Sequence, residues 1–526
     1  MRSTFQGLET ARRSLYTQQT ALHTTGHNIA NANTPGYSRQ RVNFSQTPPF
    51  PGTGLNRPDI PGQIGTGVEA GSVQRIRESF LDMQYRGENS KYGYWDTRFI
   101  ALEKMEDIMN EPTEDGIANT LDRFWTSLQD LSVHPEDSGA RSVVRQRGLA
   151  LAETFNYTSD SLVAIQRDLK VQTDVTVEHI NSLSRHINNL NNQIASVEPH
   201  GYLPNDLYDQ RDDLVDQLSQ LVNIKVEPVS SGGQSLDIAE GKYTIKLVDE
   251  NGRDLGLTLV DGVRVSSNEV SVKYDDETGL VDKIRFGPVG THENKTSGVV
   301  EIDVEDFRSV GQLKADVEAY GYLGKDGSEQ GLFPQMLQDL DTMVYTFVQE
   351  FNKIHHEGWN LNDVNAGEKG DPIDFFTYEG ESITAGNIKG AASKLRISND
   401  IATHLDNIAA SLGGFAGDGS NALALGNVKD SYLNFGGTTT TVQSFYQGVI
   451  GEMAVSTNEA ERMKGNADML RLSVDQRRES IKGVSLDEEM TNLIQFQHAY
   501  NAAARTITLV DEMLDRIING MGVGGR

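Results

Sequence analysis

Hydrophobic residues near both ends of the 526-residue chain recur at helical spacing. Near the N-terminal end, every seventh residue from Leu8 to Ile29 is apolar, which draws one straight line on a helix. Near the C-terminal end, apolar steps of three and four residues alternate without a miss. We call these two lines the assembly seam, which comprises Leu8, Leu15, Leu22, Leu493, Phe496, Tyr500, Ala503, Ile507, Val510, Leu514 and Ile517.

The middle of the chain alternates between helical and strand-like patterns. Helical spacing predicts helices over about 79–109, 114–132, 139–197, 206–222, 309–320, 332–357 and 441–480, and Asp206 is a candidate N-cap. Between about 224 and 306, short alternating runs with Gly, Asn and Asp turns predict an antiparallel β domain. The predicted fold class is therefore mainly α with inserted β domains, an α+β multidomain chain in which both ends build a long helical bundle or coiled coil.

These changes of pattern divide the chain into four predicted domains. Residues 1–50 and 484–526 form a terminal coiled coil, and residues 224–306 form the inserted β-rich domain. Residues 361–440, rich in Gly, Asn and Thr, form a second small insert. The remaining segments form the helical bundle, made of residues 51–223, 307–360 and 441–483.

A sharp break follows the first helix, in the stretch NIANANTPGYSRQRV from Asn28 to Val42. Pro35 disfavours helical geometry at Thr34, and Gly36 allows a positive φ. The stretch therefore predicts that the helix ends here and that the chain turns. The Pro- and Gly-rich residues 47–71 predict extended, irregular chain without a long helix.

A narrow apolar stripe on a polar helix is stable only against another helix. The nearest partner for each terminal stripe is the other end of the same chain, and a neighbouring copy is the second candidate. Burying eight such side chains at about 1.5–3 kcal/mol each only modestly exceeds the entropy of ordering the segment. We therefore predict that both tails are poorly ordered in the free monomer and become helical on assembly. The alternative is that each tail packs onto the main body.

Composition excludes several classes of function. The 47 basic and 75 acidic residues give a formal charge of −28, which repels nucleic acid. No stretch approaches the roughly 20 apolar residues of a membrane span, and the first residues contain no apolar segment of a cleaved secretory signal. Cysteine is absent, which suits a chain that leaves the cytosol unfolded, although compositional drift explains it too.

Few residues are candidates for a catalytic or ligand-binding site. We expect no cofactor and no metal site, and we do not expect the protein to be an enzyme. His23 and His27 have ligand-compatible spacing, but no third ligand is placed to complete a site. His355 and His356 near a helix end are interpreted as complementing the helix dipole. A catalytic insert in the middle of the chain is an alternative of a different class, but residues 225–440 show no catalytic spacing. A basic N-terminal cluster serves either solubility or contact with an acidic neighbour; it comprises Arg12, Arg13, Arg39 and Arg41.

The break after the first helix resembles the N-terminal signature of bacterial flagellar rod, hook and hook-associated proteins. The matching positions are Asn28, Ile29, Ala30, Asn31, Thr34, Pro35, Gly36 and Tyr37. Residues 484–518 resemble the closing helix of the same axial family. The stretches NDLYDQRDDLVDQLS, GQLKADVEAY and FNKIHHEGWNLN are most similar to the hook-associated proteins of the hook–filament junction.

The resemblance implies a secreted, extracellular structural protein that is exported unfolded and joins the hook to the filament. It implies as partners further copies in a ring at the hook tip, the hook protein, a second hook-associated junction protein and an export chaperone, with no nucleic acid and no membrane. The alternatives within this interpretation are another axial protein, of the hook or distal rod, and a junction protein whose insert at 361–440 binds surfaces.

The predicted disorder of the free tails has a direct test. Removing residues 1–40 or 490–526 from the monomer is expected to change its melting temperature little, because disordered tails contribute no packing. Circular dichroism during heating measures this, and a large drop in melting temperature after trimming would contradict it.

Overall fold

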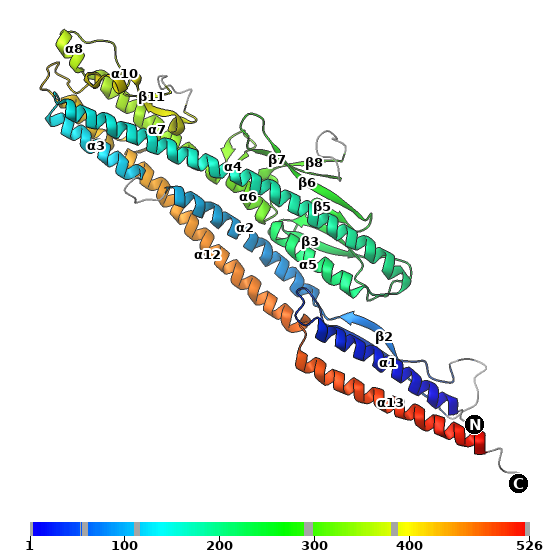
Figure 1. The fold of residues 1–526 in the computed structure, drawn as a ribbon. Helices are drawn as coiled ribbons and strands as arrows, with labels where there is room; N and C mark the ends of the chain where they lie inside the picture. Colours follow the sequence, from blue (N-terminus) through cyan, green and yellow to red (C-terminus); the bar gives the residue numbers. More distant parts are fainter. Residues whose placement is uncertain are drawn as a thin grey trace.

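The computed structural model describes residues 4–52, 54, 62–109, 116–288, 298–379 and 388–520. The molecule is elongated, and both chain ends lie at the same end of it (Figure 1). Two terminal helices, α1 (Thr4–Ala30) and α13 (Leu486–Gly520), lie side by side there, below a helical bundle that carries a β-sheet on one face. The predicted fold class, mainly α with β-rich inserts, is confirmed.

The bundle contains the helices that the apolar spacing predicts, with boundaries shifted by a few residues. They are α2 (Ser79–Met109), α3 (Ile117–Val133), α4 (Ser138–Val197), α5 (Asn205–Leu221), α6 (Gln312–Tyr320), α7 (Leu332–Glu357) and α12 (Val442–Lys482). The predicted Asp206 cap is wrong, because α5 begins at Asn205 and Pro204 occupies the N-cap position without a side-chain bond. Residues 114 and 115, predicted as the start of a helix, lie outside the described residues.

The antiparallel contact between α2 and α12 is a ladder of cations over aromatic rings. The ladder comprises Arg478 over Tyr85, Arg471 over Tyr92 and Lys464 over Phe99, at 4.1, 4.1 and 4.7 Å from the ring centres. Each cation also reaches the polar residue three positions before its ring, namely Asp82, Asn89 and Asp96. The seven-residue repeat on both helices keeps the rungs in register, so polar groups rather than an apolar stripe align these helices.

The predicted β domain is an antiparallel sheet beside α4. Its strands are β3 (Ile224–Val229), β4 (Lys242–Val248), β5 (Asp254–Asp261), β6 (Ser266–Tyr274), β7 (Val281–Pro288) and β8 (Val300–Asp303), extended by β9 (Tyr322–Leu323) and β10 (Glu329–Gln330). Two buried amides of α4 bond to both backbone groups of a strand residue. Asn181 bonds to Val270 at 2.8 and 2.7 Å, and Asn191 bonds to Tyr243 at 2.9 and 3.0 Å.

Residues 361–440 form small elements at the far end of α3, α4 and α7 (Figure 1). They are α8 (Leu361–Ala366), β11 (Phe376–Tyr378), α9 (Ala391–Lys394), β12 (Leu395–Ile397), α10 (Asn399–Thr403), α11 (Ser420–Gly426), β13 (Leu433–Phe435) and β14 (Thr438–Thr440). An aromatic cluster of Phe124, Trp125, Phe347, Phe351, Phe375 and Phe376 joins this insert to the bundle. Residues 380–387 of the predicted insert lie outside the described residues.

The predicted dipole role of His355 is wrong. Its side chain is buried, Nδ1 lies 2.7 Å from the Ile373 carbonyl, and Nε2 accepts the Ala409 N–H at 3.0 Å. Burial lowers the pKa of His355 to about 4, so the ring is neutral and anchors the insert to α7. His356 instead lies 2.8 Å from the carboxylate of Asp374.

Acidification should therefore destabilise this insert. His355 takes up its proton near pH 6.5 when unfolded but only near pH 4 when folded, so the unfolded state binds more protons between these values. As pH falls through this window, about 3 kcal/mol of stability should be lost. Denaturant unfolding followed by tryptophan fluorescence measures it.

A glutamine keeps a donor and an acceptor but does not titrate, so His355→Gln should remove the pH dependence in this window. His404 lies exposed in the same insert, and His404→Gln is the matched control that should keep it. An unchanged pH profile in His355→Gln would contradict the assignment.

Candidate assembly site

The terminal helices pair antiparallel, and a β-hairpin covers a second side of α1. The hairpin consists of β1 (Gln40–Gln46) and β2 (Val68–Arg75), which are antiparallel partners. Thr17 donates a hydrogen bond to the Val68 carbonyl at 3.1 Å, and Phe44 meets Phe496 of α13 with ring centres 5.9 Å apart. The sequence did not predict this hairpin. Residues 68–71, predicted to be irregular, belong to its second strand, so that part of the prediction is wrong. Residues 53 and 55–61 of the predicted irregular stretch lie outside the described residues.

The structure places the assembly seam along the paired helices, although the pairing is shallower than the apolar pattern suggests. Ala503 is buried, and Ile517 is exposed. The others are half-buried, namely Leu8, Leu15, Leu22, Leu493, Phe496, Tyr500, Ile507, Val510 and Leu514. The deepest positions of α1 are small or polar, including Ala11, Thr17 and Ala21. Small side chains allow close approach of the two helices, and a pattern of large apolar residues gives no sign of it.

The turn after α1 is fixed by the amide of Asn28, which is 1% exposed. Its Oδ1 accepts the Gln40 N–H at 3.0 Å, and its Nδ2 donates to the Gln40 carbonyl at 2.8 Å. The same Nδ2 reaches Glu489 of α13 at 3.1 Å. One side chain therefore ties the end of α1 to the start of β1 and to the opposite end of the chain.

The other signature residues shape the same turn. Tyr37 donates its hydroxyl to Asn28 at 2.8 Å and lies 2.9 Å from Nδ1 of His27. Asn31 donates to the His27 carbonyl at 3.0 Å and accepts from Thr34 at 3.2 Å. Gly36 has φ of 78°, as predicted. Ala30 and Pro35 are exposed and Ile29 is half-buried, so these three contribute little beyond helix and turn geometry.

The same junction connects α12 to α13. Arg39 donates to Glu489 and Glu488, at 2.7 Å each, and its backbone N–H donates to the Lys482 carbonyl at 2.8 Å. Gly483 is extended, and Ser485 caps α13 with a hydroxyl 3.5 Å from the Glu488 N–H. Arg39, just before β1, thus contacts both the end of α12 and the start of α13 and fixes the break between these two helices.

Behind this junction lies a network of buried charges that we call the charge hub. It comprises Arg75, Arg77, Arg86, Arg211, Arg478, Asp82, Asp209, Asp212, Asp216 and Glu240. Arg75 at the end of β2 contacts Asp209 at 2.6 Å and Asp212 at 2.9 Å, both on α5. Arg478 on α12 contacts Asp82 at 2.9 Å and Asp216 at 2.5 Å.

The hub is electrically balanced, with five guanidinium groups against five carboxylates. Burial alone would raise the pKa of Asp212, but Arg77, Arg75 and Arg211 outweigh it and hold that pKa well below its usual range. Such networks add little net stability, but removing one partner strands a buried charge. The hub therefore fixes how β2 of the hairpin meets α2, α5 and α12 of the bundle more than it strengthens the fold.

The remaining candidate residues do not gather into a reactive site. Among the residues that the structure describes, no group of His, Asp and Glu side chains is arranged to hold a metal ion. Arg12 and Arg13 pair with Glu9 on their own helix, at 2.9 and 3.0 Å. No helix within the described ranges has the length and apolar character needed to cross a membrane.

Family models match three parts of the chain. Residues 102–376 match the flagellar hook-associated protein FlgK helical domain. Residues 8–37 match the flagella basal body rod protein, and residues 476–520 match the C-terminal part of the flagellar basal body rod FlgEFG protein. The paired chain ends thus match models of proteins of the flagellar axis in general. The bundle matches the model of one class of these proteins, the hook-associated proteins.

Full-length relatives give the particular family. Flagellar hook-associated protein 1 of Bacillus subtilis is 47% identical over 527 residues, covering all of both chains. That of Escherichia coli is 25% identical, covering 97% of this chain and 99% of its own. The chain belongs to the flagellar hook-associated protein 1 family. The solved hook junction protein FlgK of Burkholderia pseudomallei shares its fold, with a TM-score of 0.58 at 15% identity, over 77% of this chain and all of the other.

A substitution in the hub tests its role. Arg478→Ala leaves the buried network one positive charge short, because Asp82 then has only Arg77 and Asp216 only Arg86, and it should lower the free energy of unfolding by about 3–5 kcal/mol. The adjacent, exposed Arg477→Ala should change it by about 0.5 kcal/mol or less. Urea unfolding of the two variants compares them, and equal effects would show that the hub does not couple α2, α5 and α12.

Proposed function

We propose that this protein is a structural adaptor at the junction between the flagellar hook and filament. The observation that carries the proposal is the 47% identity to a flagellar hook-associated protein 1 along the entire chain. The match of residues 102–376 to a helical domain of hook-associated proteins favours this role over a hook or distal-rod protein.

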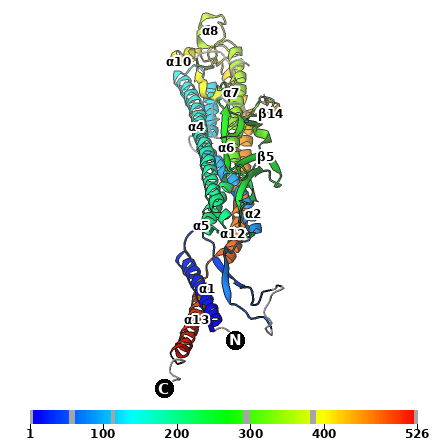
Figure 2. The ribbon, with the colours of Figure 1, turned by 90° about the vertical axis from the view of Figure 1, so that its right-hand side faces the viewer.

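The geometry supports assembly through the chain ends. Helices α1 and α13 project beyond the bundle, and much of their apolar surface is not covered by their own chain (Figures 1 and 2). Such surface is typical of a subunit that packs against neighbours. We infer that the paired helices join an inner tube of further copies and that the bundle and its inserts face outward.

The junction gives a physical reason for an adaptor role. The charge hub and the Asn28 turn fix how the terminal helices meet the bundle, so a subunit passes force between inner and outer layers without changing shape. The partners that follow are the hook protein on one side and a second hook-associated junction protein on the other. The lack of cysteine suits a chain that is exported from the cell in an unfolded state. Such a chain would be bound by an export chaperone while it is still in the cytosol.

Charges on the seam should abolish assembly. The double variant Leu493→Asp and Tyr500→Asp places two carboxylates against α1, where water is partly excluded, and no compensating cation lies on the seam. We expect a soluble protein with an intact bundle that cannot join the hook tip. Swimming in soft agar and electron microscopy of hook tips provide the measurement.

The matched control is Thr491→Asp with His498→Asp, which adds the same two aspartates, seven residues apart, at exposed positions of the same helix. It should retain at least some assembly. Normal filaments on cells that carry the seam variant would refute the role of the seam.

A further inference from the structure

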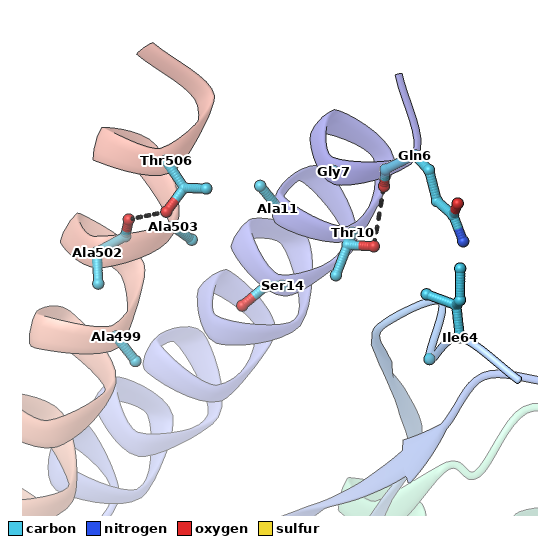
Figure 3. A pocket seen from close by; sticks show the side chains of 11 residues that line it. Gln6, Gly7, Thr10, Ala11, Ser14, Ile64, Ala499, Ala502, Ala503 and Thr506 are labelled. Carbon is cyan, nitrogen blue, oxygen red and sulfur yellow. Dashed lines mark hydrogen bonds between the residues drawn. The ribbon is translucent and has the colours of Figure 1, made fainter. Parts of the chain in front are cut away.

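The paired terminal helices have two unlike faces. On one face, a groove of about 680 Å³ runs between α1, α13 and the hairpin. Figure 3 shows it lined by small side chains, among them Gly7, Ala11 and Ser14 of α1 and Ala499, Ala502 and Ala503 of α13. None of the described residues that line it is charged. The groove is therefore uncharged, is lined mainly by small side chains, and has room for larger side chains.

The opposite face carries large exposed side chains. On α13, Leu486, Met490 and Ile494 recur every four residues and are 50%, 58% and 51% exposed. Met490, in the middle of this row, lies roughly half a turn around the helix from Ala499 and about a third of a turn or more from Ala502 and Ala503. On α1, Phe5 and Tyr16 are 64% and 60% exposed and likewise lie roughly half a turn from the groove. Because the helices are antiparallel and share the groove on one side, both rows lie on the other side, and we call them the ridge.

The ridge and the groove are complementary in size and polarity. Neither is covered by the described part of its own chain, and an apolar row of this size is costly to leave in water. The ridge cannot reach the groove of the same subunit, because the two face away from each other. A second copy of the chain can place its ridge in the groove of the first copy.

We propose that the ridge of one subunit packs into the groove of the next. This contact rests on the proposed self-assembly and adds the pair of faces that meet. Unlike faces make a heterologous contact, which continues from copy to copy as a ring or helical series rather than closing as a two-fold dimer. The rod-like bundles then all point outward from one tube.

The absence of native cysteine allows a clean cross-linking test. Full-length chain carrying both Met490→Cys and Ala502→Cys is produced in cells that lack their own copy, and isolated hook tips are treated with a short bismaleimide. We expect covalent ladders of two, three and more chains. Each single variant should remain a single chain, and so should the control pair Ala502→Cys with Gln495→Cys, whose second cysteine is exposed on the groove side of α13 and lies off the ridge.

Each outcome decides one question. Dimers of the Ala502→Cys variant alone would show that groove meets groove, and a hook-tip protein without ladders would show that ridge and groove do not meet. Both results overturn the proposed contact. Absence of the unmodified chain from hook tips would instead refute the proposed function.

A second variant protects the test against failed assembly of the cysteine proteins. Ala502→Phe fills the groove and should abolish incorporation at hook tips, whereas Ala502→Ser should retain it. Circular dichroism of the purified chains establishes that both variants keep their helices. Incorporation of the phenylalanine variant at the level of the parent would overturn the proposed contact.

Discussion

The arrangement of the molecule depends on charges that have been taken out of water at one junction. Arg75 and Arg77 lie about 400 residues before Arg478 in the chain, and these arginines find their partners only when β2, α2, α5 and α12 meet in one geometry. A misplaced element would leave an unpaired buried charge, at a cost comparable to the stability of a whole domain. The hub therefore selects a single angle between the inner helices and the outer body.

Buried asparagine provides a second recurring device. Asn28, Asn181, Asn191 and Asn352 each bond through one amide to the backbone N–H and carbonyl of a nearby strand or strand start. An amide can replace both partners that a strand residue would find in a neighbouring strand. Helices thus bind strand backbones at four places, and Asn28 does so where the chain leaves the terminal helix pair.

Local periodicity was sufficient to predict the helices, the β domain and the pairing of the chain ends. The 60-residue α4 was predicted to within one residue, and its last third carries an apolar seam that steps by three and four residues from Ile180 to Val197. The hairpin was missed because β1 and β2 are separated by Pro- and Gly-rich chain and consist almost entirely of half-buried and exposed positions, which leaves little hydrophobic alternation. The hub could not be predicted from the sequence. Asp212 pairs with three arginines, but nothing in the sequence distinguishes it from the acidic residues that line solvated helix faces. His355 was misjudged because a helix end was assumed to face water.

These features describe a subunit whose inner helices assemble and whose outer body is held at a fixed angle to them. The most direct measurement is cryo-electron microscopy of native hook tips at a resolution that traces helices. The account predicts that α1 and α13 of each chain stay paired, line the central channel and meet the bundle at the hub with the geometry described here. A channel lined by the bundle, or one in which the two terminal helices of a chain lie apart, would contradict it.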